Sequence, residues 1–322
     1  MQTFIVTTCA LLLSISVALY YLLTTTEILG YVKIAYESRH DSVSLSAIQK
    51  EALRRRQPLV PPFIDLDREY AIAPKYNLSI CRIKKSMSTL MSGISCVLFD
   101  TDTFLRLNRS ITETWSRRFC ANKNEYSRIG EVKWRMGAAR ANFTKIAVVR
   151  NPISRFVSFF INKCIQEAAK FPNRKQCYDC QGDVKCFLER QYKRFMKLAS
   201  GAARFKPGYE DKHASPLSWN CEFNRHLNEY KLVKLESDPA RRQNGLNDLL
   251  KLFREQNVPN STIDYIRKNA MEKATPHSTF SSSEKKRILK LIADDRAIRD
   301  YLRRIYYLDF IIFDFDARQL DD

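Results

Sequence analysis

The sequence predicts an α/β protein in which a parallel sheet is flanked by helices. Two observations lead to this prediction: the apolar run Ile146–Val149 is followed at once by an amphipathic helical pattern, and the run Leu78–Ile83 is followed by a second one. Strand–helix units in succession are typical of parallel sheets, whose ligands bind at the carboxyl ends of the strands. We therefore expect the basic turns after the two runs, Lys84–Ser86 and Arg150–Asn151, to lie at one edge of the sheet.

The N-terminal part of the 322-residue chain predicts a membrane anchor. Residues 4–23 carry no charge and are long enough to cross a bilayer as a transmembrane helix. No basic segment precedes them and no small-residue cleavage site is obvious, which favours a retained signal-anchor over a cleaved signal peptide. The first basic residue, Lys33, follows the span and taken alone favours the opposite orientation. The sequons and cysteines described next favour the lumen for the rest of the chain, so we expect a short cytoplasmic tail at residues 1–3, a lumenal stem at 24–68 and a folded domain at 69–322.

The formal net charge of +19 implies an acidic partner, and nucleic acid, an anionic membrane and a polyanionic glycan all fit it. Four Asn-x-Ser/Thr sequons indicate that most of the chain lies in a secretory lumen. This location argues against nucleic acid as the partner. The predicted glycosylation sites are Asn77, Asn108, Asn142 and Asn260.

The cysteines favour the same compartment. Nine are present, and all except Cys9 lie outside the apolar segment. The remaining even set permits a full complement of disulfides, whose pairing the sequence leaves open. Cys177-Tyr-Asp-Cys180 can instead bind zinc or cycle between redox states, but a lumenal chain without a second Cys-x-x-Cys favours structural disulfides.

Further elements are expected along the chain. The polar region 111–140, with Trp115 and Trp134, predicts a helix, and residues 191–199 predict a basic one. A strand is expected at Leu232–Leu235. Two more helices are expected at 245–253 and 283–307, the second long and amphipathic.

The first basic turn has the composition of a phosphate site. Lys85 precedes a helix that opens with Ser86, Ser88 and Thr89, so an ammonium, hydroxyls and backbone N–H groups can converge on one phosphate. It is not a Walker A loop, because the glycines are absent. The alternative is a surface lysine beside a capped helix.

The second basic turn leads into a helix with one apolar and one polar face. Asn151 fits the N-cap and Pro152 the first helical position. Ser154, Arg155, Ser158 and Asn162 share the polar face, next to Arg150 at the helix start, which predicts an anion site. The alternative is an ordinary strand–turn–helix whose polar face is solvated.

These segments resemble the motifs of a known family. Cys81–Thr89 resembles the 5′-phosphosulfate motif of membrane-bound Golgi carbohydrate sulfotransferases, and Arg150–Ser158, with Lys163 beyond it, resembles their 3′-phosphate motif. Trp219–Cys221, Tyr230–Glu236 and Tyr307–Phe313 are similar to later segments of the family, so that the resemblance spans about Leu78 to Phe315. The chain looks most like the chondroitin/dermatan 4-O-sulfotransferase branch, including its divergent invertebrate members.

The resemblance implies a P-loop-like nucleotide-binding fold and transfer of a sulfonate group from 3′-phosphoadenosine 5′-phosphosulfate to a glycan hydroxyl, without a metal. It implies a single-pass type II protein of the Golgi membrane, with a lumenal catalytic domain and a glycosaminoglycan or proteoglycan acceptor, for which chondroitin is expected. Lys85 is expected to be catalytic, because it stabilises charge on the leaving phosphate. The expected donor-binding residues are Lys84, Lys85, Ser86, Ser88, Thr89, Arg150, Arg155, Ser158 and Lys163.

The acceptor hydroxyl also needs a general base. His213 is the expected catalytic base because it lies in a turn-rich segment. The alternatives that stay open are His277, Glu210, Asp211 and Glu236.

The chain departs from the family pattern at three positions, with Lys84 in place of the usual Pro, Leu90 after Thr89, and Asn151 where relatives often have an acidic residue. These departures leave room for a catalytically inactive, glycosaminoglycan-binding paralogue. A nucleotide-dependent kinase is a further alternative, against which the missing Walker A glycines and carboxylate pair count. The oligomeric state stays open.

Overall fold

The computed structural model describes residues 58–137, 142–201, 206–236, 238–272 and 283–320. The predicted membrane-spanning segment, residues 4–23, lies outside these ranges. Within them, no helix combines the length and the apolar character needed to cross a membrane.

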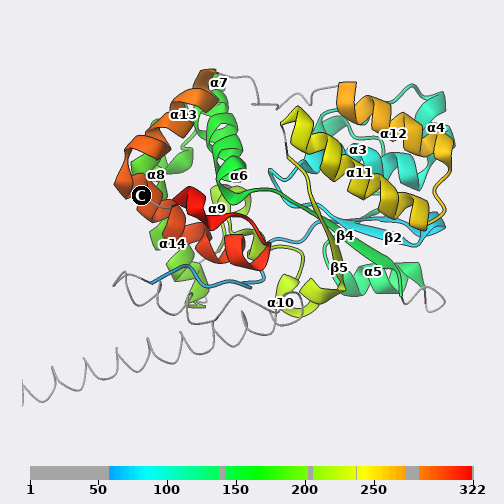
Figure 1. Ribbon diagram of the computed structural model, residues 1–322, viewed down its shortest axis with the longest axis horizontal. Coiled ribbons are helices and arrows are strands. Elements are labelled where there is room, and N and C mark those ends of the chain that lie inside the picture. The colour runs from blue at the N-terminus through cyan, green and yellow to red at the C-terminus, as the bar shows by residue number, and fades with distance from the viewer. Residues whose placement is uncertain (1–57, 138–141, 202–205, 237, 273–282, 321–322) are drawn as a thin grey trace, which may run out of the picture.

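A five-stranded sheet forms the centre of the domain, with the order β3-β1-β2-β4-β5 (Figure 1). The strands are β1 (Tyr70–Ala73), β2 (Leu78–Cys81), β3 (Glu125–Tyr126), β4 (Thr144–Val149) and β5 (Tyr230–Lys234). β2, β4 and β5 are parallel, as predicted, but β1 runs antiparallel to both β2 and β3. The predicted parallel sheet is therefore confirmed for β2, β4 and β5, whereas the sheet as a whole is mixed. The reason is the connection between β1 and β2, a single turn at Pro74–Asn77, because so short a link permits only antiparallel neighbours.

The helices form two groups, one around the sheet and one beyond its β4–β5 side (Figure 1). The sheet carries α3 (Ser88–Phe99), α4 (Thr101–Arg106), α11 (Pro239–Glu255) and α12 (Asn260–Glu272) on one face, and α5 (Ile129–Met136) on the other. The second group holds α6 (Pro152–Phe159), the π-helical segment η4 (Phe160–Glu167), α7 (Ala168–Lys170), α8 (Val184–Ala199), α9 (Tyr209–Ala214), α13 (Ser283–Asp294) and α14 (Arg296–Ile312). A short helix, α10 (Phe223–His226), precedes β5.

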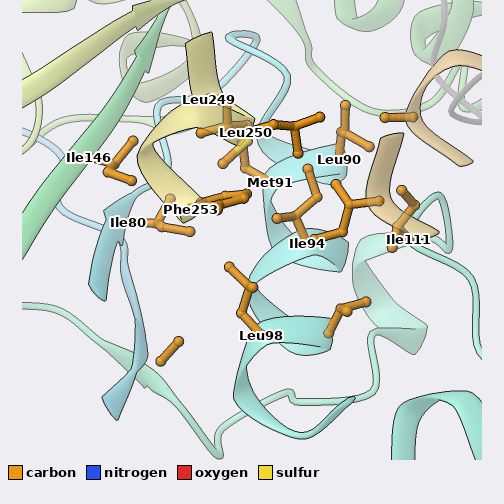
Figure 2. Packing of buried hydrophobic residues seen from close by; sticks show 14 of the residues in the cluster. Ile80, Leu90, Met91, Ile94, Leu98, Ile111, Ile146, Leu249, Leu250 and Phe253 are labelled. Carbon is orange, nitrogen blue, oxygen red and sulfur yellow. The ribbon is translucent and has the colours of Figure 1, made fainter. Parts of the chain in front are cut away.

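A large hydrophobic core lies between the sheet and α3, α11 and α12. Figure 2 shows Leu249, Leu250 and Phe253 of α11 packed toward the apolar face of α3, with Ile80 and Ile146 from the two central strands beside them. This packing fixes α3 over the end of β2, and so it fixes the position of the basic turn between them.

Two of the predicted helices are wrong in extent. In the described part of the region 111–140, residues 111–137, only α5 is α-helical, because the disulfide between Cys96 and Cys120 and the short strand β3 divide it, and it has no continuous apolar stripe to bury. The helix expected over 283–307 is two helices, because Asp295 caps the second: its carboxylate accepts from the N–H groups of Ala297 and Ile298.

All eight cysteines outside the apolar segment form disulfides, as predicted. The pairs are Cys81–Cys221, Cys96–Cys120, Cys164–Cys177 and Cys180–Cys186. Cys177 and Cys180 are bonded to other cysteines and not to each other, which rules out the zinc and redox interpretations of this pair. The bond between Cys81 and Cys221 ties the end of β2 to the segment that follows α9.

The end of the predicted stem packs on the domain. Val60 is buried, and the indole N–H of Trp219 donates to the carbonyl oxygen of Pro61 at 2.7 Å. Among the sequon asparagines, those at 108, 142 and 260 are exposed. Asn77 is half-buried in the turn before β2, with its side-chain oxygen enclosed.

Candidate functional site

The two basic turns lie side by side, because β2 and β4 are parallel neighbours in the sheet. A cavity of about 560 Å³ opens at this edge. The sequence-predicted residues that line it are Lys84, Lys85, Ser88, Thr89, Arg150, Ser158, Lys163 and His213. The edge of the sheet thus brings most of the predicted donor-binding residues and the predicted base to one cavity.

The turn after β2 is shaped to receive an anion. Lys85 and Met87 both adopt left-handed backbone conformations, with φ of 64° and 58°. Met87 is the N-cap residue of α3 and has no side-chain oxygen to accept from the first-turn N–H groups. These N–H groups, together with the hydroxyls of Ser88 and Thr89 at the cavity wall, are therefore available to a ligand at the positive end of the helix.

Lys85 is a cation whose pKa is strongly shifted by its surroundings. Its ammonium donates to the side-chain oxygen of Asn162 at 2.9 Å. Burial, followed by the charges of Lys163 and Arg150, lowers the pKa of Lys85 to about 7. An anion in the cavity would relieve this repulsion, so the local charge favours an anionic ligand.

Arg150 stands at the end of β4, where the turn to α6 begins. Its guanidinium donates to the carbonyl oxygen of Lys85 at 3.2 Å and lies 3.4 Å from the carboxylate of Glu236. Glu236, at the end of β5, also accepts from the N–H of Asn151 at 2.8 Å. The structure confirms the predicted N-cap, since the side chain of Asn151 accepts from the N–H of Ser154 at 3.0 Å. Glu236 therefore holds the second basic turn in place.

Two predicted donor-binding residues lie outside the cavity lining. Arg155 is fully buried, and its guanidinium donates to the main-chain oxygens of Lys84, Ser215 and His213. It thereby joins the first basic turn to the end of α9. Ser86 is also buried, and within the described residues its hydroxyl has no hydrogen-bond partner.

A change of helix type follows Ser158. The α-helix α6 continues without a break into the π-helical segment η4, which begins at Phe160. Segments of this kind are frequent at functional sites, where the wider turn changes which side chains share a face. Here Asn162 and Lys163, although adjacent in sequence, both line the cavity. Lys163 pairs with Glu167 inside the same segment.

His213 lies on α9, opposite the first basic turn. Its Nδ1 is 2.8 Å from the carbonyl oxygen of Tyr209. Since a carbonyl only accepts, Nδ1 carries the proton and Nε2 keeps its lone pair. Burial lowers the pKa of His213 to about 3, and the nearby Lys84 and Lys163 add to the effect. The imidazole is therefore neutral at physiological pH and able to accept a proton.

The alternative bases are held elsewhere. Glu210 accepts from the N–H of Cys177 at 3.0 Å, and Asp211 forms a buried ion pair with Arg194. Neither lines the cavity, nor does Glu236. His277 lies outside the described residues. Across the described ranges, no three or more His, Cys, Asp or Glu residues are grouped to hold a metal ion.

Sequence reasoning did not assign several residues that line the cavity. Asp67 and Glu69 both accept from the ammonium of Lys84, at 2.6 and 2.5 Å, and burial raises the pKa of Asp67. Their segment precedes β1, a strand that the sequence did not predict. Only Asn162 left a sequence signal, because it lies four residues after Ser158 on the polar face. The unassigned lining residues are Asp67, Arg68, Glu69, Met87, Leu90, Trp115, Asn162, Tyr209, Lys212, Arg242 and Ala270.

Comparison with known proteins adds independent evidence. The sulfotransferase family matches residues 68–316. The carbohydrate sulfotransferase chst-1 of Caenorhabditis elegans is 55% identical over 324 residues, which cover 98% of each chain. The putative sulfotransferase vep-2 of the same nematode is 29% identical over 232 residues, 71% of each chain. Its uncharacterized protein C18B2.2 is 26% identical over 84% of this chain and 76% of its own. No solved structure matches the chain.

Proposed function

The chain belongs to the sulfotransferase family, and from this premise we propose that it transfers a sulfonate group from 3′-phosphoadenosine 5′-phosphosulfate to a glycan. The expected acceptor is the 4-hydroxyl of N-acetylgalactosamine in chondroitin. High identity over nearly the full length to a protein named as a carbohydrate sulfotransferase supports the glycan acceptor. The observation that carries the proposal is the half-buried Lys85, which lies among like charges in the turn just before α3.

The fit of the donor rests on two anion positions at neighbouring strand ends. One is formed by Lys85, Ser88, Thr89 and the first-turn N–H groups of α3, and the other by Arg150 and Ser158. Adjacent strands are about 5 Å apart, so the two positions suit a nucleotide that is phosphorylated at both its 5′ and 3′ ends. A cavity of about 560 Å³ is within the usual range for such ligands.

The residues of the site supply what the reaction requires. When bound, the donor provides a sulfonate group on a phosphate leaving group. In the transfer, the bond between sulfur and the phosphate oxygen breaks and a bond between sulfur and the sugar oxygen forms. Lys85 and the N-terminus of α3 stabilise the charge that develops on the phosphate oxygen. Nε2 of His213 takes the proton of the sugar hydroxyl.

Burial is the main cause of the low pKa of His213, and the charges of neighbouring lysines add to it. Lys84, Lys163 and Lys85 each contribute to lowering it. A bound anionic donor would offset these charges and raise the pKa of His213 toward its ordinary value, which would make the imidazole a stronger base.

The test is transfer of labelled sulfonate to desulfated chondroitin by the purified lumenal domain. Lys85→Ala should lower kcat about a hundredfold or more, because the leaving phosphate loses its cation, while the circular-dichroism spectrum stays unchanged. Near wild-type turnover by this variant would remove Lys85 from the catalytic role. Binding of the donor without transfer would instead favour a non-catalytic glycan-binding protein, and phosphate transfer from ATP would favour a kinase.

A further inference from the structure

One cation at the cavity wall, Lys212, stands apart from the others. Its ammonium forms no hydrogen bond and no ion pair with any described residue, although it lines the cavity beside His213. The other lysines and arginines of the cavity wall are each held by an oxygen. The pairs are Arg68 with Asp65, Lys84 with Asp67 and Glu69, Lys85 with Asn162, Arg150 with Glu236, Lys163 with Glu167, and Arg242 with the main chain of Ala270.

The sheet divides the cavity into two sides. β1 and β3 lie on one side of β2, and β4 and β5 lie on the other. Arg150 and Ser158 follow β4, and Arg242 belongs to the helix after β5, so the nucleotide is expected on that side. Asp67, Arg68 and Glu69 come directly before β1 and line the opposite side, which leaves that side for the acceptor.

Lys212 belongs to the acceptor side. Burial raises the pKa of Asp67, and the charge of Lys212 opposes this rise after the larger effect of Lys84, so the Lys212 ammonium lies within electrostatic reach of that carboxylate. Lys212 also directly precedes His213, whose Nε2 is the proposed acceptor of the hydroxyl proton. Because Lys212 and His213 line the same cavity, an anionic group on the acceptor near the reacting hydroxyl can approach the Lys212 ammonium.

Arg68 provides a second cation on the same side. Its Nε donates to Asp65 at 2.6 Å, and its side chain is 31% exposed. A guanidinium has five N–H donors, so one contact with Asp65 leaves donors for a ligand. Lys212 is half-buried, where a contact between opposite charges is stronger than at a fully exposed site.

We propose that Lys212 and Arg68 form a subsite for an anionic group that the acceptor glycan carries next to its reacting hydroxyl. The group is a uronic acid carboxylate or a sulfate already present on the chain. This inference rests on the proposed function, because it takes the second substrate to be a glycan. It adds a site that selects charged glycans over neutral ones.

The experiment compares three acceptors in parallel: desulfated chondroitin, its neutral carboxyl-reduced form, and a carboxyl-reduced chain that retains sulfate away from the reacting hydroxyl. The proteins are the wild type, Lys212→Gln, Arg68→Gln and the control Lys231→Gln, which removes an exposed lysine of β5 outside the cavity lining. Lys212→Gln should lower kcat/KM for the charged chain about tenfold, as expected for one charged contact. The neutral chain should be unaffected, the donor KM should stay constant, and Arg68→Gln should act in the same direction.

The comparison of the three acceptor chains identifies which anionic group the subsite binds. If Lys212→Gln lowers kcat/KM for desulfated chondroitin but not for its carboxyl-reduced form, the subsite binds a carboxylate. If Lys212→Gln again lowers kcat/KM for the carboxyl-reduced chain that retains sulfate, the subsite binds a sulfate. An equal loss on charged and neutral chains, or no loss on either, would overturn the subsite. So would a wild type that prefers the neutral chain.

Failure of the subsite and failure of the proposed function remain distinguishable. Binding of the same three chains is measured in the presence of 3′-phosphoadenosine 5′-phosphate, and it does not depend on turnover. A protein that transfers sulfonate but binds charged and neutral chains equally keeps the proposed function and loses the subsite. A protein that transfers to none of the chains, yet binds the charged ones through Lys212, keeps the subsite and loses the proposed function.

Discussion

Lys85 is half-protonated near neutral pH, because burial and the neighbouring Lys163 and Arg150 lower its pKa to about 7. The same ammonium is the group that faces the proposed leaving phosphate. A bound anion favours the charged form and raises the pKa again, so binding and protonation are coupled at this residue.

This coupling predicts proton uptake when a nucleotide binds. Below about pH 6 Lys85 is already charged and little uptake is expected, whereas near pH 8 the free site is mostly neutral and uptake should approach one proton. Affinity for 3′-phosphoadenosine 5′-phosphate should fall as the pH rises above the pKa of the free site. Titration calorimetry in buffers of different ionisation enthalpy measures the uptake. Lys85→Arg is the control, because a guanidinium stays charged; equal uptake by this variant would assign the proton to another group.

Arg155 is buried next to the site but does not line the cavity. Its guanidinium is enclosed and donates to three main-chain oxygens, one of them in the first basic turn. Arg155→Met should lower the free energy of unfolding by about 2–4 kcal/mol, because those buried carbonyls lose their donors. Urea denaturation measures the loss. If stability is kept and donor affinity alone falls, Arg155 acts as a phosphate ligand, as the family resemblance implies.

At the scale of elements, the strand–turn–helix units were predictable and their neighbours were not. Apolar runs and helix-start residues predict β2, β4, α3 and α6. The structure confirms each of these elements at nearly the predicted position. β1 is only four residues long, and its pairing with β2 depends on a turn that no local apolar pattern reports. Lys212, Asp67 and Trp115 reach the cavity through long-range packing, which is why no spacing in the sequence connects them to Lys85.

The disulfides act on these elements to different extents. Cys81–Cys221 closes a loop with a sequence separation of 140, whereas Cys180–Cys186 closes one of only 6. In the chain-entropy account, removing the first costs about 5 kcal/mol of unfolding free energy and removing the second about 2 kcal/mol. Paired Cys→Ser substitutions, compared by urea denaturation, measure both. Equal losses would mean that local packing and not loop length governs the effect.

The whole chain has a formal net charge of +19. Most cations of the cavity wall, in contrast, are paired with protein oxygens. The long-range field therefore comes from many surface lysines and arginines, while the chemistry depends on a few enclosed ones. These two contributions respond differently to salt, because ions screen exposed charges well and enclosed charges poorly.

Salt should therefore change the encounter with a polyanionic acceptor more than the chemical step. Between about 0.05 and about 0.5 M NaCl, kcat/KM for desulfated chondroitin should fall about tenfold or more, since screening weakens the attraction between the basic domain and the chain. The value of kcat at saturating acceptor should change by less than about twofold, because Arg150 is buried and Lys85 is half-buried, so that salt screens them less than surface charges. Steady-state kinetics at several salt concentrations separates the two parameters. The carboxyl-reduced chain is the matched control and should show little dependence. If kcat/KM for the charged and neutral chains fell in parallel, the basic surface would not be the feature that recruits the acceptor.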